Sequence, residues 1–165
     1  MPRRVLSIAA AALVAGCVLE GIAAPRPLLV WNATASAPVG LYRRQFGPVE
    51  RQDWVLVRAP RAAADLAATR GYLPQAVPLV KRVAAKSGDR VCRNGGTVSV
   101  NGRLAARALL RDTKGRNLPV WSGCLVLGRD QVFLLAPASA SFDSRYFGPV
   151  ALSNVIERIA PLWTS

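Results

Sequence analysis

The sequence predicts a mainly β domain with one or two short helices, and two observations lead to this fold class. Short aliphatic runs recur between turn signals, which is typical of β domains. These runs lie at 53–58, 123–128 and 131–135. A further strand at 97–100 leads into Asn101-Gly102, a residue pair that favours a tight hairpin turn. At 165 residues, the chain suits one domain of moderate size plus an additional segment.

Only one run is strongly helix-prone. Residues 61–70 are rich in Ala, and Gly71 follows at the position where a residue with positive φ closes many helices. Two stretches rich in turn-forming residues, Gly88-Asp89 and 112–116, predict a turn and a loop.

The first 24 residues are predicted to form a membrane anchor, and residues 25–165 a single folded domain. Arg3 and Arg4 precede Val5–Ala24, an almost uninterrupted apolar run that is long enough to cross a bilayer as a helix. The basic start is expected in the cytoplasm, which places the rest of the chain outside. A cleaved secretory signal and a lipoprotein signal with lipidation at Cys17 are the alternatives, and both give the same placement.

Cys92 and Cys124 are the two cysteines outside the N-terminal segment. An oxidising compartment permits a disulfide between them, which would stabilise the fold by ~3–4 kcal/mol in the chain-entropy model. Two free buried thiols are the alternative.

Composition limits the chemistry of the domain. The chain has no His, which excludes Ser-His-Asp and Cys-His catalysis and nearly every zinc site, so we expect neither a metal nor a cofactor. It carries 22 Lys and Arg against 9 Asp and Glu, and the lysines are only Lys81, Lys86 and Lys114. Because Arg stays protonated at any working pH, these lysines are the candidate amine bases.

The excess of arginine predicts a basic surface that faces anionic lipid or an acidic partner. Charge alone would also allow nucleic-acid binding. The sequence contains no helix-turn-helix, RNP or zinc-finger pattern, so no nucleic-acid partner is expected.

Lys81 is the candidate general base. Val77, Leu79, Lys81 and Val83 alternate onto one face if this run is a strand. Desolvation among aliphatic side chains disfavours the ammonium and lowers the pKa of a Lys, as a general base requires. The alternative is a Lys whose stem packs on apolar surface while its ammonium reaches water.

Ser36 is the candidate nucleophile, within the stretch Trp31–Tyr42. Pro38 biases Ala37 towards extended geometry and Gly40 permits a turn. We therefore expect an extended loop of small residues that exposes the Ser36 hydroxyl to a peptide. An ordinary connecting loop is the alternative. The other motifs of the chain favour a catalytic site over such a loop.

A third polar run lies near the C-terminus, at 141–149. Asp143 and Arg145 are placed to form an ion pair that shapes a pocket, and Ser141 to hydrogen-bond an amine. A polar turn with its own local pairing is the alternative.

In this order, the three runs resemble the motifs of the signal peptidase I superfamily of Ser/Lys peptidases, family S26. SAPVGLYRR resembles the nucleophile box Ser-x-Pro-x-Gly-Leu-Tyr, PLVKRVAAKSGDRV the Lys box, and SFDSRYFGPV the C-terminal Ser-x-Asp-x-Arg box. The TraF-type peptidases of conjugative transfer are the favoured branch. The reason is that Ala136-Pro-Ala-Ser-Ala stands where leading signal peptidases carry Gly-Asp-Asn-Arg. The resemblance covers roughly residues 30–165 and implies a signal-peptidase-like β-barrel or sandwich domain behind an N-terminal transmembrane helix.

Carried onto this chain, the resemblance implies Ser36 as the nucleophile and Lys81 as the general base. The other site residues that it implies are Thr34 and the Ser36 backbone N–H for the oxyanion hole, Ser141 to orient the Lys81 amine, and Asp143 with Arg145 as a structural pair.

The resemblance also implies a function. A membrane-anchored serine endopeptidase would cleave a secreted precursor, a conjugative pilin subunit, through an acyl-enzyme on Ser36. Water would release the acyl group by hydrolysis, whereas an amine of the precursor would release it as a ring. The implied location is the inner membrane, with a single span and the domain on the periplasmic side. Two alternatives are a catalytically inactive anchored β-domain that scaffolds a conjugation or secretion assembly, and a basic DNA-binding factor.

Overall fold

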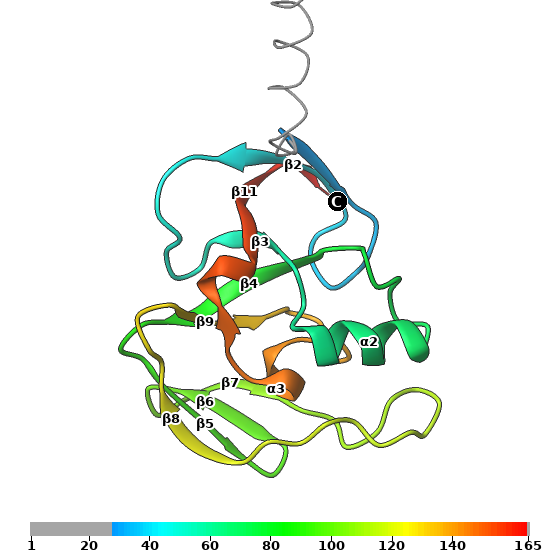
Figure 1. Cartoon of the computed structure of the whole chain (residues 1–165), viewed down its shortest axis with the longest axis vertical. Coiled ribbons are helices and arrows are strands. Elements are labelled where there is room, and N and C mark those ends of the chain that lie inside the picture. The colour runs from blue at the N-terminus through cyan, green and yellow to red at the C-terminus, as the bar shows by residue number, and fades with distance from the viewer. Residues whose placement is uncertain (1–27, 165) are drawn as a thin grey trace, which may run out of the picture.

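The computed structural model describes residues 28–164 (Figure 1). The predicted anchor at 1–24 lies outside these residues, and no helix within 28–164 is long and apolar enough to cross a membrane. The elements, in chain order, are β1 (Leu29–Asn32), β2 (Gly40–Gln45), β3 (Trp54–Val57), α2 (Arg61–Thr69), β4 (Leu79–Lys86), β5 (Arg90–Asn94), β6 (Thr97–Val100), β7 (Arg103–Arg107), β8 (Gly123–Val126), β9 (Gln131–Leu135), α3 (Ser144–Phe147), β10 (Val150–Ala151), a 3-10 turn (Leu152–Asn154) and β11 (Val155–Thr164).

The strands form two antiparallel sheets, which confirms the mainly β prediction. The larger sheet has the order β1-β2-β11-β3-β4-β9-β10, and the smaller has the order β7-β6-β5-β8. The long strand β11 pairs with both β2 and β3 and so joins the first hairpin to the rest of the larger sheet. Because β1 and β10 stand at the two ends of the order, the larger sheet is open rather than a closed barrel. The smaller sheet lies below it in Figure 1.

Apolar residues pack on both faces of the larger sheet, because its central strand β3 carries consecutive aliphatic residues. Val55 and Val57 point into one core, whereas Leu56 between them points into another. A further core lies between the two sheets, where Phe133 of β9 packs with Val91 of β5. Burial on both faces explains why the run at 53–58 is continuously apolar rather than alternating.

The chain passes between the two sheets at a corner built around Asp89. Strand β4 ends at Lys86, and the chain enters β5 after the predicted turn. The buried Asp89 carboxylate accepts hydrogen bonds from the Lys86 N–H at 2.9 Å, Asn101 Nδ2 at 2.7 Å and Arg51 Nε at 2.7 Å. These donors come from both sheets and from the loop before β3, so the carboxylate fixes their relative position.

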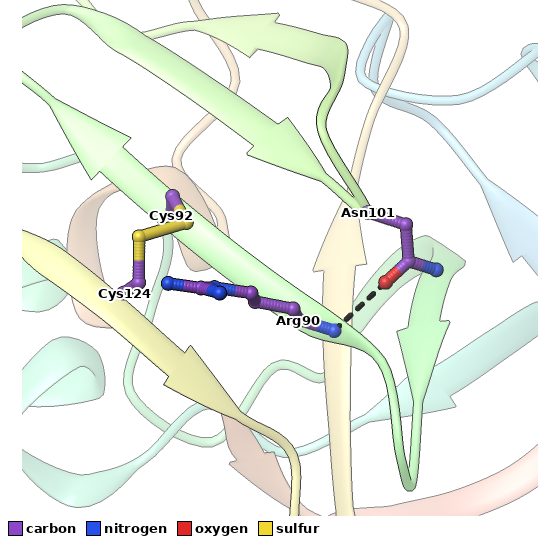
Figure 2. Close-up of a disulfide and its surroundings, with 4 residues drawn as sticks. All are labelled: Arg90, Cys92, Asn101 and Cys124. Atoms are coloured by element: carbon purple, nitrogen blue, oxygen red, sulfur yellow. Dashed lines mark hydrogen bonds between the residues drawn. A yellow bond between two sulfur atoms is a disulfide. The ribbon is translucent and has the colours of Figure 1, made fainter.

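Figure 2 shows how the smaller sheet is held together. A disulfide joins Cys92 of β5 to Cys124 of β8, and these residues are directly opposite in the strand register, with Cα atoms 4.0 Å apart. In the same view, the Arg90 N–H donates to Asn101 Oδ1 at 2.9 Å. Asn101 and Gly102 have φ values of 49° and 80°, as the predicted hairpin turn requires.

Helix α2 ends as its sequence predicts. Gly71 has φ +70°, and its N–H donates to the Ala68 carbonyl. The Tyr72 N–H donates to the Ala67 carbonyl, which completes a Schellman arrangement. This tight ending places Tyr72 in the lining of a cavity that also includes Ala67 of the helix.

Val77 does not share the β4 face of Lys81, contrary to the prediction. Strand β4 begins at Leu79, and Val77 is 45% exposed and donates its N–H to the Pro74 carbonyl in a turn. Pro78 has no N–H to contribute to the sheet, so the strand starts after it.

Gly40→Ala should strongly destabilise the fold. Gly40 opens β2 with φ +144°, and a Cβ there would meet the Trp163 carbonyl of the neighbouring strand β11. Because strain and overpacking add, we expect urea unfolding to show a loss of roughly 3 kcal/mol or more. Gly102→Ala is the matched control, since its φ is also positive but no atom lies within 4 Å of the added Cβ. It should cost about 1–2 kcal/mol, and equal losses in the two variants would contradict the packing argument.

Candidate active site

Ser36 lies in the loop 33–39, at the tip of the hairpin formed by β1 and β2. The prediction of an extended loop is wrong for 34–37. The Ala37 N–H donates to the Thr34 carbonyl at 3.5 Å, which makes this segment a turn. The reason is that Pro38 restricts mainly the residue before it, and leaves the two earlier residues free to turn.

Asn32 holds this turn together, although its sequence context did not mark it as a site residue. Its side chain is buried, and its Nδ2 donates to the carbonyls of Thr34, Ala37 and Pro38 at 2.9, 3.1 and 3.0 Å. Its Oδ1 accepts from the Thr34 N–H at 3.3 Å and from Thr34 Oγ1 at 3.1 Å. An Asn two residues before a turn residue is the spacing of an Asx turn, which is the signal that was available.

The hydroxyls of Thr34 and Ser36 are in contact, with Oγ1 and Oγ 3.0 Å apart. Because Asn32 Oδ1 can only accept, the Thr34 hydroxyl donates to it, and Ser36 is therefore the donor to Thr34. The Ser36 N–H makes no hydrogen bond within the described part of the chain. It is thus available to an oxygen atom from outside.

Lys81 comes from the middle of β4, where strand alternation places it between Leu79 and Val83 and opposite Val55 of β3. Its side chain is only 2% exposed. The amine donates to Ser141 Oγ at 2.5 Å. Burial disfavours the ammonium form and lowers the pKa of Lys81 from 10.5 to about 8.

Asp143 and Arg145 form a buried ion pair that frames Ser141. Arg145 Nε and Nη2 donate to the two Asp143 carboxylate oxygens at 2.8 and 2.9 Å, and Asp143 also accepts from the Arg145 N–H at the start of α3. Ala136 contacts both, because its N–H donates to Asp143 and its carbonyl accepts from Arg145. On the pKa of Lys81, burial has the largest effect; the Asp143 charge raises it and the Arg145 charge lowers it.

Arg93 lies behind this pair and was missed by the sequence reasoning. It is 1% exposed, and its Nη1 donates to the Arg145 carbonyl at 2.6 Å and to the Pro119 carbonyl at 3.2 Å. Its only sequence signal is the alternation with Val91 in β5, which puts both residues on the buried face. Arg93 thus ties the smaller sheet to the segment that carries the ion pair.

A cavity of about 310 Å³ brings the candidate residues together, with Thr34, Ser36, Lys81 and Ser141 in its lining. The rest of the lining is mainly apolar. It comes from the end of α2 and the residues after it, from β4, from the loop after β7, and from α3 and the segment that enters it. Its apolar and aromatic members are Ala67, Tyr72, Leu73, Leu79, Leu109, Leu118, Phe142 and Tyr146. No hydrogen bond joins Ser36 to Lys81 within 28–164, because each contacts a hydroxyl neighbour instead.

The other two lysines lie away from this cavity. Lys86 Nζ pairs with Glu50 Oε2 at 2.6 Å, and Lys114 is exposed in the predicted loop after β7. Lys81 is therefore the lysine that shares a cavity with Ser36. Across residues 28–164 there is no group of three or more His, Cys, Asp or Glu that could hold a metal ion.

Comparison with known proteins identifies the family. A profile described as signal peptidase, peptidase S26, matches residues 1–163. The chain belongs to this family. A plasmid transfer protein TraF from Escherichia coli is 38% identical, over 81% of this chain and 81% of its own length. A second Escherichia coli protein of that name is 36% identical, over 92% of this chain and 96% of its own length.

A probable conjugal transfer protein TraF from Sinorhizobium fredii is 40% identical to this signal peptidase family member, over 76% of this chain and 71% of its own length. Among solved structures, a signal peptidase I from Enterococcus faecalis aligns with a TM-score of 0.43 and 20% identity, over 70% of this chain and 100% of that one. The family match and the TraF relatives confirm the resemblance drawn from the three sequence boxes. In the fold, these boxes occupy the β1–β2 loop, β4 and the segment entering α3, and all three reach one cavity.

Asn32→Asp should loosen the turn of this S26-family site. The substitution keeps the size and the Oδ1 acceptor but removes the donor to three carbonyls. We expect thermal and urea unfolding at pH 7 to show a loss of roughly 2–4 kcal/mol, because the carbonyls lose their donor and a carboxylate is buried. Asn94→Asp, at an exposed position, is the control and should change stability by less than about 0.5 kcal/mol. A similar small effect at Asn32 would contradict its role in holding the turn.

Lys81→Met should stabilise the fold at neutral pH. The unfolded state holds the Lys81 proton up to its ordinary pKa of 10.5, and the folded state releases it at about 8. Below pH 8 the buried ammonium therefore costs the wild-type fold on the order of 3 kcal/mol. Between pH 8 and 10.5 the wild-type protein gains stability as pH rises, so the advantage of Met should shrink across this window. Urea unfolding of both proteins from pH 7 to 10.5 measures the difference, and a gap that does not change with pH would refute the lowered pKa.

Proposed function

We propose that this protein is a membrane-anchored serine endopeptidase that cleaves a secreted precursor, with Ser36 as the nucleophile and Lys81 as the general base. The observation that carries the proposal is the shared cavity. It holds the Ser36 hydroxyl and a buried amine whose pKa is lowered to about 8, in a chain without His. A Ser hydroxyl needs a base to become a nucleophile, and a desolvated Lys supplies one near neutral pH.

In the proposed reaction, the neutral Lys81 amine takes the Ser36 proton as Oγ attacks the scissile carbonyl carbon. This requires the Ser36 side chain to rotate from Thr34 towards Lys81. The tetrahedral intermediate then collapses, the peptide C–N bond breaks, and the Lys81 ammonium returns the proton to the leaving amine. Ser141 accepts a hydrogen bond from Lys81 throughout and keeps the amine directed at the reaction. The product at this stage is an ester between Ser36 and the precursor.

The oxyanion of the intermediate needs donors, and two groups are placed to provide them. The Ser36 N–H has no partner within 28–164. The Thr34 hydroxyl lies 3.0 Å from Ser36 Oγ, and it would have to turn its proton from Asn32 Oδ1 to the oxyanion. Loss of one such donor typically lowers kcat by about 10²–10³-fold. Asn32 positions the Thr34 hydroxyl directly, and it positions the Ser36 N–H through the turn that its side chain holds between Thr34 and Ala37.

The ester can be resolved in two ways. Water that attacks the acyl carbon gives hydrolysis, whereas an amine of the precursor gives a new amide and a ring; both restore the Ser36 hydroxyl. The precursor that we propose is a pilin-like subunit, on the strength of relatives named for plasmid or conjugal transfer. Mass spectrometry separates the outcomes, because ring closure removes one further water from the product.

The proposed location is the periplasmic side of the inner membrane, with residues 1–24 as a retained anchor. The Cys92–Cys124 disulfide supports it, since disulfides persist in oxidising compartments. Directly after the proposed anchor, β1 and the end of β11 expose a group of apolar side chains. Its members are Leu28, Leu29, Trp31, Leu162 and Trp163. The rings of Trp31 and Trp163 have centroids 6.4 Å apart, and Trp is enriched where proteins meet the membrane interface.

Ser36→Ala and Lys81→Arg should each abolish cleavage of candidate pilin precursors while the variants stay folded. Arg keeps the positive charge but cannot accept the Ser36 proton. In the wild-type protein, kcat/KM should rise about tenfold per pH unit below 8 and level off above it, because only the neutral Lys81 amine is active. Mass spectrometry of the precursors from pH 6 to 10 measures both effects.

Cleavage by either variant would refute the Ser36–Lys81 pair. The hydrogen bond of Ser36 to Thr34 instead of Lys81 is the observation that favours an inactive scaffold. That reading expects unchanged precursor processing in the Ser36→Ala strain, and lost conjugation only when the domain is deleted.

A further inference from the structure

A second cleft, of about 730 Å³, lies where β4 and β9 of the larger sheet meet β6 and β7 of the smaller one. Its floor is apolar and includes Val100 and Leu135. Its rim is basic and carries Arg51, Arg82 and Arg103. Arg82 directly follows Lys81 in β4, so strand alternation sends the two side chains to opposite faces.

A third, smaller hollow shares lining residues with both the cleft and the cavity at Ser36. This hollow, of about 290 Å³, is lined by residues 35–39 and by Pro137. Pro137 also lines the basic cleft, and Ser36 also lines the catalytic cavity. A peptide that crosses Ser36 therefore has the apolar cavity on one side and a path past Pro137 to the basic cleft on the other.

The positive charge of this cleft is only partly neutralised by the protein. Arg51 is paired with Asp89, and burial of that carboxyl is outweighed by its hydrogen-bond donors, which lower its pKa to about 2. Neither Arg82 nor Arg103 has a carboxylate partner within 28–164.

Arg82 is also held in place. Its Nε donates to the Gln52 carbonyl at 3.0 Å, and its guanidinium lies 5.8 Å from the centre of the Trp54 ring. These contacts leave the terminal guanidinium nitrogens of Arg82 without a partner among the described residues. A planar guanidinium that is fixed at its Nε and open at its end is suited to bind a carboxylate.

We infer that the basic cleft binds an acidic segment of the precursor, on the opposite side of the scissile bond from the apolar cavity. Arg82 and Arg103 would pair with its carboxylates, while the apolar floor receives the stems of those side chains. This inference rests on the proposed function, because it takes the occupant to be the chain that is cut at Ser36. It assigns to this protein a preference for substrates with acidic residues near the cleavage site.

The test uses the full-length protein in neutral detergent micelles and a fluorescent tetraglutamate peptide, with tetraglutamine as the neutral probe. Fluorescence polarisation at low salt should show binding of tetraglutamate alone. Arg82→Gln with Arg103→Gln should weaken that binding about tenfold or more. Arg58→Gln with Arg129→Gln removes the same net charge from exposed positions outside the cleft and should change the affinity by less than about twofold.

Equal losses in the two double variants, or equal binding of tetraglutamine, would overturn the inference. A benzophenone at the end of the peptide should crosslink to residues 35–39 or to Pro137, and crosslinks confined to other surfaces would also overturn it. A last experiment tests vesicles of phosphatidylglycerol as competitors of the peptide. If the vesicles bind through Arg82 and Arg103 and displace the peptide, the cleft recognises lipid headgroups and the peptide assignment fails.

The outcome is separable from that of the proposed function, because binding needs no bond cleavage. The Ser36→Ala protein should bind tetraglutamate as the wild-type protein does. If precursor cleavage depends on Ser36 and Lys81 but the peptide does not bind, only the basic cleft is wrong. If the peptide binds at the cleft but no precursor is cut, the cleft stands and the peptidase assignment fails.

Discussion

Burying a lysine amine among apolar side chains contributes little to the stability of a fold, yet the candidate site is built around one such amine. Lys81 sits between Leu79 and Val83 with the Ser141 hydroxyl as its hydrogen-bond partner within 28–164, and burial brings its pKa to about 8. Most arrangements of the chain would let this long side chain reach water and restore its ordinary pKa. The fold prevents this by placing Lys81 in β4, an inner strand of the larger sheet that lies between β3 and β9. In a chain without His, that placement is what makes a base available near neutral pH.

The position of Ser141 depends on a second buried group of charges. The carboxylate of Asp143 binds Arg145 through two donors and caps α3, while Ala136 binds both residues. Removing either ion alone would leave a buried, uncompensated charge, which commonly costs about 3–5 kcal/mol. The two charges of the pair shift the pKa of Lys81 in opposite directions, so their electrostatic effects on the amine oppose each other. Its main contribution is therefore geometric, since it holds the Ser141 segment against β4.

Much of this site was predictable from sequence, because its main residues sit in motifs whose local pattern carries the information. Lys81 stood out by alternation with aliphatic neighbours, and Gly71 by its place after an Ala-rich run. Asn32 and Arg93 were not predictable in the same way. Arg93 donates to a carbonyl that only the fold brings near, that of Arg145, 52 residues along the chain. The partners of Asn32 are local, but its Asx-turn spacing alone indicates a turn and not a site. The turn at 34–37 was missed together with Asn32, since it is fixed by that side chain rather than by the local preference of Pro38.

The register of β4 links the proposed general base, Lys81, to the proposed recognition residue, Arg82. Successive residues of a strand face opposite sides, so a slip of one position would put Arg82 in the apolar cavity and Lys81 in the basic cleft. Arg82 in the cavity could not serve as a base at any working pH, and the rim of the cleft would lose its fixed guanidinium. Two features oppose such a slip. Pro78 prevents the strand from starting earlier, and the bulge between Val83 and Ala85 matches β4 to β9 in one alignment. The same pairing thus places a cation that can release its proton on one face and a cation that cannot on the other.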